Sequence, residues 1–100
     1  PGQAAAWGIA GLATSAAITG LVNSAISSQS SYITVPNSNY QLDYTTIKGS
    51  GDVVTFQAFN GNSTVYYTAN CRQGLLNGNT PRSGDEAQLL NAACQVGFGR

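Results

Sequence analysis

Two cysteines, Cys71 and Cys94, are the only ones in this 100-residue chain, which contains no histidine. A tetrahedral zinc site needs four ligands from Cys, His or carboxylate, so this pair lacks the partners for one. The lack of further ligands therefore favours a disulfide, with two buried free thiols as the alternative. Closing a loop of about 24 residues stabilises a fold by roughly 3 kcal/mol, and such bonds persist outside the reducing cytosol.

The residues around each cysteine predict what the bridge connects. Val53–Phe59 alternates as a half-buried strand, and the turn signal Asn60–Ser63 leads into a partner strand over 64–71. Cys71 shares the inward face of that strand. Ser83 and Glu86 have the spacing of a capping box, so a helix is expected to begin there and to carry Cys94 on its buried side.

The rest of the chain completes an α+β fold, a small antiparallel β-sheet with a disulfide-linked C-terminal helix and a small-residue-rich N-terminal helix. Short strands are expected over 32–35 and 40–47, and 72–82 is expected to be an exposed loop. We divide the chain into a signal-peptide remnant (1–6), an Ala/Gly-rich helix and linker (7–30) and a disulfide-stapled α+β domain (31–100).

The first residues suggest export. Ala4 and Ala6 fit the small-residue pattern of a signal-peptidase site, although these alanines also suit the start of the following helix. That helix, up to Ile26, has no charge, and its apolar side chains do not keep to one stripe. Its small residues recur at four-residue spacing, a pattern that lets two backbones approach closely. The candidate self-association residues are Gly11, Ser15, Ala16, Gly20 and Ser24.

Packing of this segment onto its own domain or onto copies of itself is the favoured interpretation. Membrane contact and disorder are the alternatives. Membrane contact is not favoured, because the hydropathy of this segment is too weak for clear insertion.

Over residues 40–94 the chain resembles the bacterial surface-adhesin E-like families and small exported cyanobacterial proteins. The matching features are short: 42–47 (LDYTTI), a glycine turn, 53–56 (VVTF), the pair Tyr66 and Tyr67 leading to 70–72 (NCR), and an acidic-capped helix ending in Cys94. The resemblance implies an exported antiparallel domain with a packed helix and, in adhesin members, binding to extracellular matrix proteins. It assigns no binding residue here.

The residue inventory argues against an enzyme. Without histidine, acid–base chemistry depends on four carboxylates, of which Asp85 and Glu86 suit the helix start and Asp52 a turn. Asp43 lies inside a strand, where we expect it on the exposed face, bonded to a neighbouring turn. Four scattered cations make no stripe for nucleic acid. No cofactor or metal is expected.

We therefore expect a non-catalytic exported module, secreted, extracellular or periplasmic, that contacts a protein or glycan at a cell surface. The candidate binding patch consists of Phe59, Tyr66 and Tyr44, because exposed aromatic side chains favour interfaces. The alternative is a structural subunit of an extracellular fibre or sheath that packs through its N-terminal helix. Only 8% of residues are charged and the net charge is zero, so little repulsion opposes self-association.

Overall fold

A computed structural model describes residues 14–98. Over this range the chain forms two helices and a five-stranded antiparallel sheet, which confirms the predicted α+β class. The sheet order follows the chain order, so each strand pairs with the next. The elements are α1 (Ser15–Ser27), β1 (Ile33–Thr34), β2 (Tyr40–Ser50), β3 (Val53–Asn60), β4 (Ser63–Asn70), β5 (Leu75–Leu76) and α2 (Gly84–Phe98).

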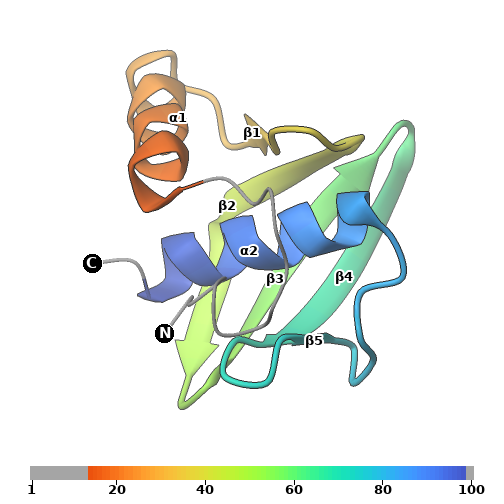
Figure 1. Cartoon of the computed structure of the whole chain (residues 1–100). Coiled ribbons are helices and arrows are strands. Elements are labelled where there is room, and N and C mark those ends of the chain that lie inside the picture. The colour runs from red at the N-terminus through yellow and green to blue at the C-terminus, as the bar shows by residue number, and fades with distance from the viewer. Residues whose placement is uncertain (1–13, 99–100) are drawn as a thin grey trace.

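The sheet has one covered face. Helix α2 lies across it, and α1 packs beside α2 and β1 (Figure 1). The central strand β3 directs Val54, Phe56 and Ala58 into this core, where each is at most 3% exposed. The residues between them face the other way, as the alternation predicts.

Glycine shapes both tight hairpins of the sheet. Gly51 joins β2 to β3 and Gly61 joins β3 to β4, and each has a φ of +62°. In a two-residue hairpin of type II′, the first central residue has a positive φ and is therefore glycine. The predicted turn over 60–63 is confirmed, with the positive φ at Gly61 alone of these four residues.

Helix α2 begins with a capping arrangement that differs in one bond from the predicted one. The Glu86 backbone N–H donates to Ser83 Oγ at 3.3 Å, as expected. The Glu86 carboxylate accepts from the Arg82 backbone N–H at 3.0 Å instead of reaching Ser83. Asp85 accepts from the Asn39 backbone N–H at 3.0 Å, which ties the start of α2 to the turn before β2.

The predicted disulfide is confirmed, with Cys71 and Cys94 bridged at a Cα–Cα distance of 5.7 Å. Both are at most 2% exposed. The bridge joins the turn after β4 to the middle of α2, which continues past Cys94 to Phe98. Eight consecutive residues of α2, 87–94, are buried, so this helix lies inside the fold rather than on it.

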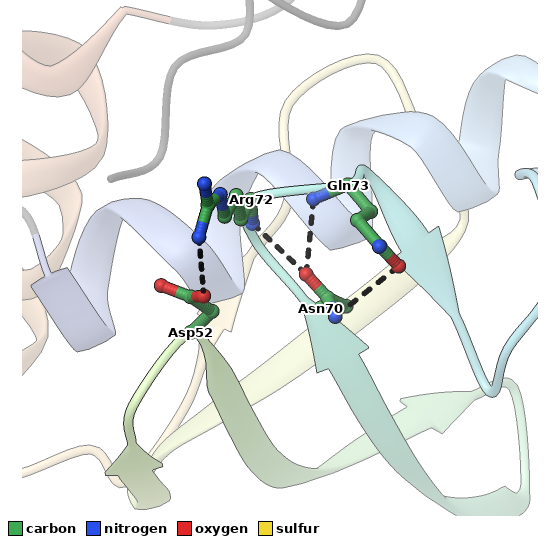
Figure 2. A network of polar contacts seen from close by, with 4 residues as sticks. All are labelled: Asp52, Asn70, Arg72 and Gln73. Atoms are coloured by element: carbon green, nitrogen blue, oxygen red, sulfur yellow. Dashed lines mark hydrogen bonds and ion pairs between the residues drawn. The ribbon is translucent and has the colours of Figure 1, made fainter.

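Figure 2 shows how the turn that carries Cys71 is held. Asn70 Oδ1 accepts from the backbone N–H groups of Arg72 and Gln73, at 3.1 and 2.9 Å. Arg72 lies 3.6 Å from the Asp52 carboxylate in an exposed ion pair of little energetic weight. The Cys71 N–H donates to the Asp52 carbonyl at 2.8 Å, so backbone bonds, not the ion pair, position the cysteine.

Helix α1 starts at Ser15, where Thr14 Oγ1 accepts from the Ala17 N–H at 3.2 Å. Its buried side chains form one stripe, but Ile26 lies off that stripe at 57% exposure, so the apolar residues of α1 do not all share one face, as the sequence indicated. Ile18 and Ala25 enter the shared core, and Leu21 and Val22 pack against it. Neither helix of the described range has the length and apolar character that a membrane crossing requires. The predicted signal-peptide remnant lies outside the described residues.

The segment 72–82 is exposed over most of its length, as expected, but it is not a loop throughout. Leu75 and Leu76 form β5, which pairs with Asn70 and Ala69 at the end of β4. Leu76 is 4% exposed and belongs to the core. Two apolar residues are too short a run to predict a strand, so the pairing comes from the long-range contact.

We predict that replacing both cysteines with alanine lowers the free energy of unfolding by about 3 kcal/mol, because the unfolded chain then gains the freedom of the opened loop. Urea unfolding of the oxidised protein and of the double variant Cys71→Ala/Cys94→Ala measures this. Reductant should lower the midpoint of the wild type and leave the double variant unchanged. Equal midpoints for the two oxidised proteins would contradict a stabilising bridge.

We predict that Gly97→Ala destabilises the protein by about 1–2 kcal/mol, because overpacking outweighs the helix-propensity gain near a helix end. A Cβ atom there would meet Val54 Cγ1 at 2.6 Å. Gly20→Ala in α1 is the matched control, since a Cβ meets nothing within 4 Å there. It should stabilise the fold by up to about 1 kcal/mol. A Val54→Ala background should reduce the cost at Gly97; an unreduced cost would exclude the contact as its cause.

Candidate functional site

The face of the sheet opposite α2 carries a groove of about 540 Å³. It runs over β2, β3 and β4, whose outward side chains alternate with the core residues. Its rim carries Tyr66, which is 73% exposed and is the most exposed large hydrophobic side chain of the described residues. The lining residues are Thr45, Thr46, Lys48, Thr55, Phe56, Gln57, Tyr66, Tyr67 and Thr68. Of these, Phe56 and Tyr67 direct their rings to the core side of the sheet, between the outward-facing residues.

An irregularity in β2 shapes one wall of the groove. The β2–β3 register shifts between Asp43, which pairs with Gln57, and Lys48, which pairs with Thr55. Five steps along β2 therefore face two steps along β3, which is a large bulge. Bulges bend a strand and increase its local twist. Thr45 and Thr46 lie inside this bulge and line the groove.

Side-chain hydrogen bonds replace the missing ladder bonds of the bulge. The Asp43 carboxylate accepts from the Thr45 backbone N–H at 3.1 Å and also from the Thr45 hydroxyl. Thr46 Oγ1 donates to the Asp43 carbonyl at 2.8 Å and accepts from the Gln57 N–H at 2.9 Å. Asp43 is 8% exposed, so the expectation of an exposed position was wrong. Its carboxylate is a structural acceptor that fixes the bulge.

Aromatic rings form a layer on the inner side of the same strands. Tyr67 stacks on Phe56 with ring centroids 5.7 Å apart and meets Tyr40 edge-on at 6.2 Å. The hydroxyl groups of Tyr40 and Tyr67 are hydrogen-bonded at 3.1 Å. Burial, followed by that hydrogen bond and the electrostatic effects of Tyr40 and Glu86, raises the pKa of Tyr67 well above its ordinary value of 10.0.

The three predicted patch residues take different places. Tyr66 is the only one of them that lines the groove. Phe59 is half-buried and packs edge-on against Tyr32, with ring centroids 6.2 Å apart. Tyr44 packs against the core and donates its hydroxyl to the Ser30 carbonyl.

Sequence reasoning missed the polar residues that surround Tyr66. Threonine at alternating positions of β3 and β4 was the available signal, since Thr55 and Thr68 are paired partners that flank the groove. The contributions of Thr45 and Thr46 depend on the bulge, which the alternating pattern of 40–47 concealed.

The candidate self-association residues lie partly within the described range. Ala16, Gly20 and Ser24 are exposed on α1, and no atom approaches the Cβ position of Gly20 within 4 Å. Ser15 is the first residue of α1, and Gly11 lies outside the described residues. Association through this helix stays a prediction.

Cys71 and Cys94 leave no free thiol, so neither cysteine provides a nucleophile in the oxidised chain. In the range 14–98, no three Asp, Glu or Cys side chains gather closely enough to hold a metal ion.

No protein-family model matches this chain, and no curated protein or solved structure is significantly similar to it. The resemblance to surface-adhesin E-like families stays a prediction.

We predict that stability falls as the pH rises above about 10, because unfolded Tyr67 loses its proton there while folded Tyr67 keeps it. Below that pH both states are protonated and this contribution is fully present. Urea unfolding between about pH 8 and 11 measures the loss, which Tyr67→Phe should reduce. Tyr66→Phe is the control, because it removes the exposed phenol at the neighbouring position of β4 and leaves Tyr67 in place. An identical alkaline loss in Tyr67→Phe would contradict the assignment.

Proposed function

We propose that this chain is a non-catalytic exported binding module that takes a neutral polar chain, best matched by a glycan, into the outer-face groove. The observation that carries the proposal is the lining. Hydroxyl and amide side chains surround one strongly exposed tyrosine, and among the lining residues of the described range Lys48 alone is formally charged.

The lining suits the hydrogen-bonding character of a sugar. A threonine hydroxyl both donates and accepts, and a glutamine amide does the same through separate atoms, so Thr55, Thr68 and Gln57 match the mixed capacity of sugar hydroxyls. Tyr66 adds a flat apolar ring with one polar end, which suits the apolar face of a sugar ring. A ligand with several negative charges would have one cation to pair with, Lys48, so the lining suits a neutral ligand better.

Rigidity supports recognition at this place. Gln57 lies in the central strand β3, paired on both sides by β2 and β4. The bulge beside it is fixed by bonds from Asp43 and Thr46. Side chains on such a scaffold lose little freedom when a ligand binds, which lowers the cost of association.

The same lining supports a non-catalytic role. It contains no carboxylate, so the groove offers no acid–base pair of the kind that glycoside hydrolysis requires. The disulfide is compatible with an extracellular or periplasmic protein, and export remains part of the proposal.

We predict that Tyr66→Ala weakens glycan binding at least roughly tenfold while leaving the melting temperature unchanged, because an interface aromatic of this kind contributes more than about 1 kcal/mol. A glycan array with neutral and acidic members identifies the ligand, and calorimetry measures its affinity. The effect of salt should be small, since the groove carries one cation.

Tyr32→Ala is the matched control, because Tyr32 is also exposed, at 42%, and does not line the groove. It should leave binding unchanged. Equal losses in both variants would place the site elsewhere, and binding to acidic glycans or to polypeptides alone would contradict the neutral ligand.

A further inference from the structure

Along β4, alternate residues direct their backbone N–H and C=O groups toward β3 or away from it. The Cys71 N–H donates to the Asp52 carbonyl, which makes these residues a hydrogen-bonded pair beyond the last β3–β4 partners. Hydrogen-bonded pairs recur at every second residue of an antiparallel ladder. Val65 and Tyr67 therefore point their backbone groups toward β3, and Thr64, Tyr66, Thr68 and Asn70 point theirs outward.

The chain closes one half of this outer edge itself. Thr68 donates its N–H to Asn77 Oδ1 at 2.8 Å, and its carbonyl accepts from the Asn77 N–H at 2.7 Å. Asn70 pairs with Leu75 of β5. From Thr68 onward, the outer edge of β4 is therefore not free to pair with another strand.

The other half of the edge is open. Within residues 14–98 no backbone or side-chain partner satisfies the outward N–H and C=O groups of Thr64 and Tyr66. Ser63, Thr64 and Tyr66 are all exposed. In Figure 1, β5 runs beside only one end of β4, and the strand extends well beyond it toward the β3–β4 hairpin.

This open stretch lacks the features that usually protect an edge strand. The segment 63–67 contains no charge, no proline and no glycine, and every residue of 64–67 is β-branched or aromatic. Charged side chains, prolines and bulges are the common protections against strand pairing. The chain as a whole has no net charge, so a second copy meets no electrostatic barrier.

We propose that β4 pairs antiparallel with β4 of a second copy, across a two-fold axis at Val65. The open stretch is symmetric about this residue, because the hairpin ends it at Ser63 and the Asn77 closure ends it after Tyr67. The register pairs Thr64 with Tyr66 of the second copy and Tyr66 with Thr64 of the second copy. Each of these pairs exchanges two N–H···O=C bonds, so all four outward groups are satisfied.

A hollow lies beside the open edge of β4. It measures about 250 Å³, lies on the core side and is lined in part by Val65, Tyr67 and Asn77. The register places Ser63 of the second copy opposite Tyr67, next to this hollow.

The two-fold axis stands perpendicular to the joined sheet, so both outer faces lie on the same side. The dimer then presents two outer-face grooves on one continuous surface, with the two Tyr66 residues close to the axis. The pairing does not depend on the proposed ligand, but it would make binding to a repetitive polymer bivalent.

A charge-swap experiment at the axis tests both the surface and the register. Sedimentation velocity of the oxidised protein over about 1 µM to 1 mM should show a monomer–dimer equilibrium. Val65→Lys or Val65→Glu should each raise the dissociation constant at least roughly tenfold, because like charges then face each other across the axis. An equimolar mixture of the two variants should dimerise again, since lysine then faces glutamate.

Thr34→Lys is the matched control, an exposed threonine in β1 at the opposite edge of the sheet. It should leave the equilibrium unchanged. Thr64→Lys, at an exposed position, provides a second disrupting variant, and circular dichroism checks the fold of each protein. Wild-type protein that stays monomeric throughout overturns the proposal. A dimer that survives Val65→Lys, or a mixture that stays monomeric, overturns the surface or the register.

Groove binding is measured separately. A monomer that still binds glycan refutes the dimer alone, and a dimer that binds none refutes only the proposed ligand.

Discussion

The fold depends on how closely α2 lies against the sheet. Gly97 leaves no room for a Cβ atom beside Val54, and Cys94 is bridged to the end of the neighbouring strand at Cys71. At the other end of the helix, Asp85 accepts a backbone hydrogen bond from Asn39. The helix is thus held at three places along its length, and its buried residues occupy one face of the sheet. The opposite face of the sheet is not covered by α2 and carries the groove.

The outer face is polar but carries little charge. A buried carboxylate normally needs a cation, but Asp43 is satisfied by a backbone N–H and a threonine hydroxyl in the bulge that it stabilises. Thr46 completes the arrangement by replacing a ladder bond to Gln57. The bulge therefore brings the hydroxyl groups of Thr45 and Thr46 into the groove without adding charge to its lining.

Features set by neighbouring residues could be predicted from the sequence, and features set by distant contacts could not. The alternation of β3 and the inward direction of both cysteines follow from periods of two and 3.6 residues. The Ser83 cap follows from its three-residue spacing to Glu86. The outward direction of Tyr66 follows from the same period of two in β4. The bulge breaks the alternation after Asp43, so Tyr44 turns to Ser30 rather than joining an exposed patch. Strand β5 exists because Leu76 completes the core, and no local pattern records that.

Tyr66 connects the two proposals physically. Its side chain stands at the rim of the groove, and its backbone groups belong to the open edge of β4. Pairing with a second copy would fix the backbone of Tyr66 and so restrict its ring before any ligand arrives. A ligand that binds the dimer would then meet a ring that is already ordered and would lose less conformational entropy. Dimerisation would therefore favour ligand binding. Thermodynamic linkage makes the effect mutual, and a ligand that orders Tyr66 would favour the dimer to the same extent.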